Sequence, residues 1–72
     1  MPSFETDLFK TWLGEALTGL GRYAEAEGLL EECYADLRGR VGEQNFYTTE
    51  ARRVLRELSE ARREAARAAP VQ

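Results

Sequence analysis

The stretch from Leu13 to Tyr34 reads LGEALTGLGRYAEAEGLLEECY, and its pattern decides the fold of this 72-residue chain. Apolar residues recur in it at spacings of three and four, as they do on one face of an α-helix. Gly21 interrupts the pattern, and glycine readily takes the positive φ that ends a helix and starts a turn. A turn of only two or three residues makes the two flanking helices antiparallel neighbours. We therefore expect a helical hairpin.

Small residues within this stretch indicate where the two helices approach each other. Gly14 costs about 1 kcal/mol relative to alanine inside a helix, and we expect the close approach of a second helix to compensate. Cys33 has no second cysteine to pair with. Because Cys33 lies on the apolar face of its helix, we expect it to be a small buried hydrophobic residue. The residues expected to define the fold are Leu13, Gly14, Leu17, Gly21, Tyr23, Ala26, Leu30, Cys33, Leu55 and Leu58.

The remainder of the chain predicts a third helix. Asn45, or Thr48 and Thr49, could cap the N-terminus of this helix. After Leu58 the apolar positions of the helix hold only alanines. The expected helices span about 4–20, 22 or 23 to 38, and 45 or 48 to 68. The expected organisation is a lead-in at 1–6, a helix-turn-helix at 7–40, a linker at 41–47, a capping helix at 48–66 and a frayed tail at 67–72.

Composition agrees with an all-α fold of one small domain. Hydrophobic residues make up 43% and charged residues 32% of the chain, which is ordinary for a helical globular protein and too apolar for a disordered one. Alanine, leucine, glutamate and arginine dominate, and all four favour helix. A chain of this length buries a small share of its surface, so we expect its stability alone to be marginal.

The charge of the chain argues against a general attraction to nucleic acid or to a membrane. The formal net charge is −3, which does not attract polyanions. Residues 52–67 hold six of the ten basic residues, and glutamates are interleaved with them. We read that segment as a solvated helix face, with a nucleic-acid-binding arm as the alternative. No apolar run approaches the length of a membrane span, so we expect a cytoplasmic protein and no membrane partner.

The sequence offers no set of residues for catalysis. There is no histidine, which removes the commonest general base and the commonest metal ligand. A single cysteine cannot make a zinc site of the usual pattern. The glycines lack the preceding strand and the following Gly-Lys-Ser/Thr of a phosphate-binding loop. We expect no enzyme, no cofactor and no metal.

The hairpin stretch resembles a tetratricopeptide repeat. Leu13, Gly14, Gly21, Tyr23 and Ala26 match the types that this repeat uses, at its spacing. Departures are a lysine at position 10, where the family has an aromatic residue or leucine, and the absence of the closing proline. The resemblance covers about residues 7–58 and implies a fold in which each repeat packs against its neighbours.

A second likeness concerns the length of the repeat. The segment Gly42-Glu43-Gln44-Asn45 and the residues after it look like the start of a further repeat in the 42-residue kinesin-light-chain-type variety, with Leu55 equivalent to Leu13. No glycine turn follows Leu58, so the third helix is interpreted as a cap. The hairpin also resembles the repeats that follow the kinase domain in bacterial serine/threonine kinases.

The repeat resemblance implies a protein–protein interaction module whose front helices line a groove. Its partner would be a peptide or protein, or the neighbouring repeats of a longer chain. The residues that the register places on the groove side are Leu8, Thr11, Trp12, Glu15, Thr18, Glu50, Arg53 and Glu57. The alternative is a small protein that forms a homodimer through Phe4, Phe9 and Trp12. Because a first helix with so many apolar residues has no helix before it, we expect part of this surface to be exposed.

Overall fold

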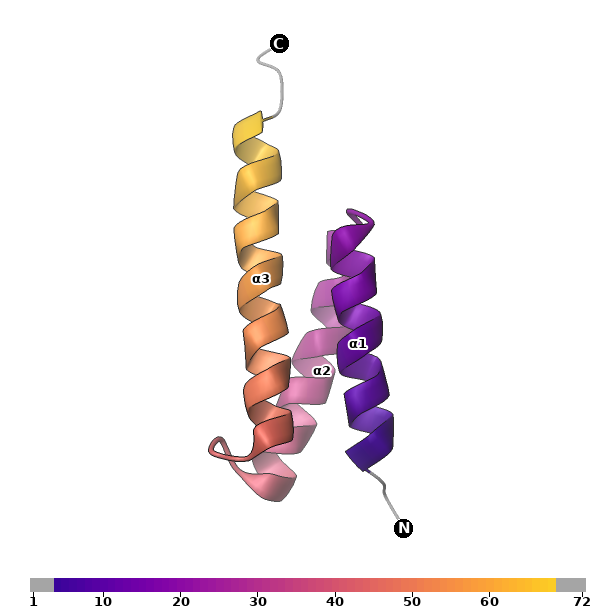
Figure 1. Ribbon diagram of the computed structural model, residues 1–72, viewed down its shortest axis with the longest axis vertical. Helices are drawn as coiled ribbons and strands as arrows, with labels where there is room; N and C mark the ends of the chain where they lie inside the picture. The colour runs from indigo at the N-terminus through magenta and orange to yellow at the C-terminus, as the bar shows by residue number, and fades with distance from the viewer. Residues whose placement is uncertain (1–3, 69–72) are drawn as a thin grey trace.

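The chain folds into three α-helices over residues 4–68, which are the residues that the computed structural model describes. Helix α1 spans Phe4–Gly19, α2 spans Tyr23–Val41 and α3 spans Phe46–Ala68. Figure 1 shows α2 running antiparallel to α1, with α3 returning in the direction of α1 and extending beyond the α1–α2 turn. The described residues contain no strand, so the predicted all-α class is confirmed for them.

The turn between α1 and α2 lies where the sequence predicts it. Gly21 has φ +79°. The N–H of Arg22 donates to the Leu17 carbonyl (2.9 Å) and the N–H of Gly21 donates to the Thr18 carbonyl (3.1 Å). These two bonds form a Schellman motif, in which a left-handed glycine lets the chain satisfy the last carbonyls of the helix. The predicted turn at Gly21 is confirmed.

The second connection spans residues 42–45 and contains the cap of α3. Gly42 has φ +86° and its N–H donates to the Arg38 carbonyl (3.2 Å). The side-chain oxygen of Asn45 accepts from the N–H of Tyr47 (2.9 Å), so Asn45, rather than Thr48 or Thr49, caps the helix. Helix α3 therefore begins before residue 48 and α2 extends to Val41. Likewise, α1 begins at Phe4, inside the expected lead-in, and α3 reaches Ala68, beyond residue 66.

The core consists of two clusters between the helices. The first contains Ala26, Leu30, Val54 and Leu58, with the partly buried Leu17, Tyr23 and Leu55 packed against it. The second contains Cys33, Leu37 and Ala51, with Tyr34, Val41 and Tyr47 packed against it. Seven of the ten residues expected to define the fold lie in or against these clusters, the exceptions being Leu13, Gly14 and Gly21. Helix α2 contributes the fully buried Leu30 and Leu37, α3 contributes Leu58, and α2 packs against both of the other helices.

The glycine at position 14 is where the side chain of Leu30 on α2 packs directly against the backbone of α1. A Cβ atom placed there would lie 2.5 Å from Cγ of Leu30, closer than real Cβ contacts come. Leu30 is completely buried and belongs to the first cluster. The missing side chain of Gly14 therefore provides the space that Leu30 occupies, as the sequence predicts.

Leu13 is an exception among the residues expected in the core, because it is 43% exposed. Consecutive residues of a helix point about 100° apart. Because Gly14 faces α2, the side chain of Leu13 is turned away from it. The α1 face that meets α2 instead carries the small or polar residues Asp7, Thr11 and Gly14, all of which are buried. The predicted role of Leu13 in the helix contact is wrong for this reason.

Thr48 permits a first stability prediction. Its hydroxyl is completely buried and has no hydrogen-bond partner among the described residues. Because a buried polar atom without a partner carries a desolvation penalty, Thr48→Val is expected to raise the free energy of unfolding by about 1 kcal/mol. Thr11 is equally buried, but its hydroxyl donates to the Asp7 carbonyl (2.9 Å). Thr11→Val is expected to lower stability by about 1 kcal/mol. Urea unfolding of both variants checks the pair, and a loss in both would contradict it.

Candidate functional site

Thr11 does not belong to the predicted groove surface. It is 1% exposed, and its hydroxyl lies 3.3 Å from the Cys33 sulfur as well as bonding to α1's own backbone. The resemblance to the tetratricopeptide repeat placed Thr11 on the groove side of the first helix, whereas the structure places it between α1 and α2. A β-branched polar residue suits this position because its hydroxyl finds a carbonyl one turn earlier in the same helix. Thr11 is therefore unavailable to a partner.

The charged residues of the predicted groove do come together, but they form ion pairs with one another. The guanidinium group of Arg53 lies 2.6 Å from a carboxylate oxygen of Glu57, 2.9 Å from Glu50 and 3.4 Å from Glu15 on α1. The hydrogen bond to Glu50 contributes most to raising the pKa of Arg53, which leaves it charged. Glu15 and Arg53 confirm that α1 and α3 lie side by side. Exposed ion pairs of this kind contribute little stability and leave no unpaired charge directed at a ligand.

The other predicted groove residues offer little more. Leu8 is partly buried, and the hydroxyl of Thr18 donates to the Gly14 carbonyl (2.8 Å). Of the eight residues predicted to contact a partner, Trp12 is the one large apolar side chain that is mostly exposed. Apart from Leu8 and Trp12, the groove side of the described structure is thus polar, and its charged residues are paired with one another.

A different surface of α1 is apolar and open. Phe9 is 64% exposed, Trp12 56% and Leu20 72%. The exposure of Phe9 and Trp12 confirms the expectation that part of the first helix lacks a covering helix. We call this surface the α1 outer face, and it consists of Phe9, Trp12, Leu13, Ala16 and Leu20. Spacings of three, four and one place all five on one side of the helix.

The sequence indicated Phe9 and Trp12 of the α1 outer face as an alternative homodimer surface, and Trp12 also as a groove residue. Leu13 was expected in the helix contact instead. The apolar stripe alone does not say which of its sides α2 and α3 cover. The side chain of Phe4, the third residue of the expected homodimer surface, lies outside the described residues.

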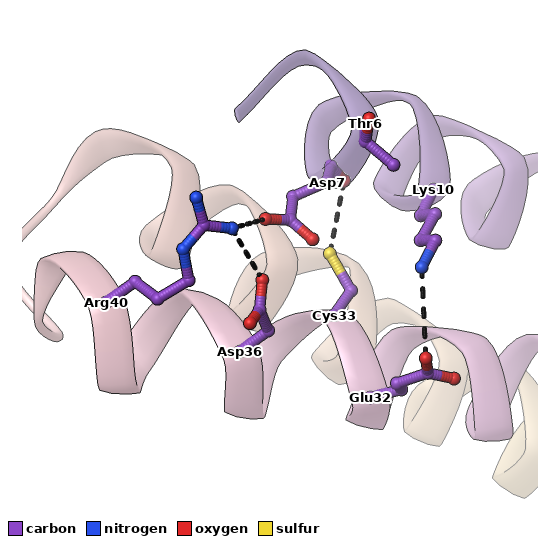
Figure 2. A pocket seen from close by; sticks show the side chains of 7 residues that line it. All are labelled: Thr6, Asp7, Lys10, Glu32, Cys33, Asp36 and Arg40. Carbon is purple, nitrogen blue, oxygen red and sulfur yellow. Dashed lines mark hydrogen bonds and ion pairs between the residues drawn. The ribbon is translucent and has the colours of Figure 1, made fainter. Parts of the chain in front are cut away.

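A pocket of about 430 Å³ lies between the start of α1 and the second half of α2 (Figure 2). Sequence reasoning did not find it, because its residues come from two helices and form no local pattern. Figure 2 shows acidic and basic side chains meeting across it. The residues that line the pocket are Thr6, Asp7, Lys10, Glu32, Cys33, Asp36 and Arg40.

The charged groups of this pocket are paired across the two helices. Arg40 lies 3.3 Å from a carboxylate oxygen of Asp7 and 3.0 Å from one of Asp36, and Lys10 lies 3.8 Å from Glu32. The side chain of Asp7 is almost completely buried, and its burial raises its pKa above the ordinary value. The hydrogen bond with Arg40 lowers the pKa of Asp36. Arg40 therefore joins the N-terminal turn of α1 to α2.

The thiol in the pocket is not a reactive one. Burial raises the pKa of Cys33, and its S–H donates to the Asp7 carbonyl (3.1 Å). A thiol with a raised pKa stays protonated near neutral pH and is a weak nucleophile. Within residues 4–68 no three His, Cys, Asp or Glu side chains are grouped so that they would hold a metal ion. The pocket is best described as a set of ion pairs that hold two helices together.

Neither family models, nor curated proteins, nor solved structures gave a match to this chain. Across residues 4–68, no helix combines the length and the apolar character that crossing a membrane requires.

The two aspartates of the pocket predict opposite responses to pH. The raised pKa of Asp7 means that its contribution to stability is present at low pH and is lost as the pH rises through the folded-state pKa. The lowered pKa of Asp36 means that its contribution is present above its ordinary value, about 4, and is lost as the pH falls through the folded-state pKa.

Two variants test these signs by urea unfolding over a range of pH. Relative to the unmodified chain, Asp7→Asn is expected to gain stability as the pH rises above about 4. Asp36→Asn is expected to lose stability, relative to the unmodified chain, as the pH rises from below toward about 4. The variants are matched, because each removes one carboxylate from the same arginine. Two difference curves that change in the same direction would contradict this account of the pair.

Proposed function

We propose that the chain is a protein–protein interaction module whose docking surface is the α1 outer face. The observation that carries this proposal is the exposure of Phe9, Trp12 and Leu13 on one side of α1 and of Leu20 directly after its end. Single exposed apolar residues are common on proteins, whereas a contiguous apolar patch marks an interaction site. The partner is a protein or peptide that presents a helix, either in another chain or in the neighbouring repeats of a longer one.

The repeat register supports a helical partner. Under the 42-residue equivalence of Leu13 with Leu55, the α1 outer face corresponds to the face by which α3 docks onto the hairpin. Phe9, Trp12 and Ala16 correspond to Ala51, Val54 and Leu58, and those three α3 residues are buried in the core. Helix α1 therefore presents outward the surface that α3 uses to pack on helices. The architecture that we propose is a tetratricopeptide-like hairpin with α3 as its cap.

The opposite end of the molecule supports the capping role of α3. The α1 positions that contact α2 include Asp7, Thr11 and Gly14, and the same register places Thr49, Arg53 and Arg56 at the equivalent positions of α3. All three α3 residues are exposed. Arg56 stands on α3 where Gly14 stands on α1, and its long side chain leaves no room for a further helix to pack there as α2 packs on α1. One end of the stack is thus closed by polar side chains, while the α1 end is open and apolar.

The arginines of α3 give less support to nucleic-acid binding. Arg53, Arg62 and Arg67 each form an ion pair with glutamate, Arg62 reaching Glu27 on α2. Pairing of this kind neutralises the local charge that would attract phosphates. We therefore place the interaction at the apolar face of α1 and propose no nucleic-acid or membrane partner. A cytoplasmic location, where Cys33 stays reduced, suits this proposal.

Fluorescence of Trp12, the single tryptophan, provides the test. A synthetic amphipathic helix of leucine, lysine and glutamate serves as the probe partner. The protein concentration is kept low enough that the chain is monomeric. Docking on the α1 outer face is expected to shift the tryptophan emission to shorter wavelength and to saturate. Leu20→Lys is expected to abolish the shift. Phe46→Lys is the matched control, because Phe46 is 65% exposed on α3 and outside the α1 outer face. An emission spectrum that the probe leaves unchanged would refute the proposal.

A further inference from the structure

We propose that the α1 outer face docks on the same face of a second copy of this chain, with the two α1 helices antiparallel about a twofold axis near Gly14 and Glu15. This inference rests on the proposed function of that face as a docking surface and names its partner. A twofold contact uses one surface twice, so the surface must complement itself.

The sizes of the side chains are self-complementary in an antiparallel pair. With the axis between residues 14 and 15, a residue before the axis meets the residue equally far after it in the other copy. Phe9 then meets Leu20, and Leu13 meets Ala16. Trp12, at the edge of the α1 outer face, then lies near Leu17 of the other copy. Leu13 opposite Ala16 places a large residue against a small one on both sides of the axis, which lets the helices approach there, and the larger Phe9 and Leu20 meet farther from the axis.

The charges at the two ends of the face favour the same orientation. No charged residue is part of the α1 outer face between Phe9 and Leu20. Glu5, exposed at the start of α1, continues the stripe in one direction. Arg22, which forms an exposed ion pair with Glu25 (2.8 Å) and has 56% of its side chain exposed, lies just beyond the other end. In the antiparallel pair Glu5 of each copy lies at the same end as Arg22 of the other. A parallel pair would place like charges together, and it would also align the two helix dipoles unfavourably.

The size of the surface predicts a dimer that dissociates on dilution. The exposed parts of Phe9, Trp12, Leu13 and Leu20 amount to on the order of 500 Å² per copy. Two copies, with the flanking residues, then bury about 1,000–1,200 Å², the lower limit for a specific interface. Because the patch is mostly apolar and centred on an indole ring, most of the binding free energy is expected from Trp12 and its neighbours.

Sedimentation equilibrium over about a thousand-fold dilution tests the association. The mass of the full chain is expected to fall from that of two chains to that of one. Ala16→Glu places a charge beside the proposed axis without disturbing the core, since Ala16 is exposed. It is expected to keep the chain monomeric throughout, while Phe46→Lys is expected to leave the association unchanged. Circular dichroism confirms that each variant keeps its helices.

Exchange of the end charges tests the orientation. Glu5→Arg brings two arginines together at each end of the antiparallel pair, and it is expected to weaken association by about five- to tenfold at low salt. The double variant Glu5→Arg/Arg22→Glu restores opposite charges at both ends and is expected to recover the original association. In a parallel pair neither the loss nor the recovery would occur. A dimer insensitive to these changes would overturn the inference.

The outcomes separate this inference from the proposed function. A chain that is monomeric at every concentration but still shows the Trp12 shift with the helical probe overturns the second-copy inference and leaves the proposed function standing. A dimer that survives Ala16→Glu forms through another surface and also overturns the inference. If neither association nor the Trp12 shift is observed, both proposals fail.

Discussion

Replacing Gly14 with alanine is expected to lower the free energy of unfolding by about 2 kcal/mol, although alanine is the better helix former. The new Cβ would lie 2.5–3.0 Å from three carbon atoms of the Leu30 side chain. Leu30 is completely buried, so it cannot move aside without disturbing the first core cluster. Overpacking of this kind costs about 1–3 kcal/mol or more, which exceeds the gain of about 1 kcal/mol in helix propensity.

Gly28 provides the matched control for this substitution. It lies in the interior of α2, it is exposed, and a Cβ there would meet no atom within 4 Å. Its φ is not positive, so alanine fits the backbone without strain. Gly28→Ala is therefore expected to raise stability by about 0.5–1 kcal/mol. Urea unfolding followed by circular dichroism measures both variants. If both glycines respond alike, the close approach at Gly14 is not what determines the residue there.

Replacing Leu30 with alanine is expected to have the largest effect, a loss of about 3 kcal/mol. Leu30 is fully buried on α2 and belongs to the cluster that joins α2 to α3. The substitution removes buried apolar atoms and leaves a cavity, because neighbouring side chains relax only in part. A domain of this size has a total stability of roughly 4–10 kcal/mol. The variant is therefore expected to unfold at a much lower urea concentration and temperature.

The double variant Gly14→Ala/Leu30→Ala tests whether the two residues share one space. In that variant the new Cβ on α1 enters the volume that the leucine side chain has left. The combined loss is expected to be smaller than the sum of the two single losses by about 1–2 kcal/mol. A strictly additive result would show that the cost of Gly14→Ala arises elsewhere. Residues in contact couple in such cycles, whereas distant ones do not.

The positions of the helices could be predicted from sequence because their signals are local. Gly21 ends α1, Asn45 caps α3, and the spacing of the leucines indicates helix throughout. The candidate site could be predicted less well. Thr11 was placed on the groove surface and is buried, while Leu13 was placed in the helix contact and is 43% exposed. Both errors come from the rotation of α1 about its axis, which a broad apolar stripe does not specify.

The α1 outer face and the pocket differ in how far sequence reasoning could reach them. The many apolar residues of the first helix indicated that part of its surface is exposed, and Phe9 and Trp12 are more than half exposed. The pairing of Asp7 with Arg40 joins residues 33 positions apart and has no sequence signal. Only the crossing of α1 over α2 brings those side chains together (Figure 2).

The sequence by itself determined that the chain forms three helices, with a glycine turn after the first and a polar N-cap before the third, because propensity, turn and cap depend on neighbours a few residues away. The tertiary structure decided which side of α1 is buried. The side chain of Leu30 on α2 packs against the backbone of α1 at Gly14, where no side chain intervenes, and this contact sets the rotation of α1. Its small and polar residues consequently face inward, and the aromatic side of the helix is left open.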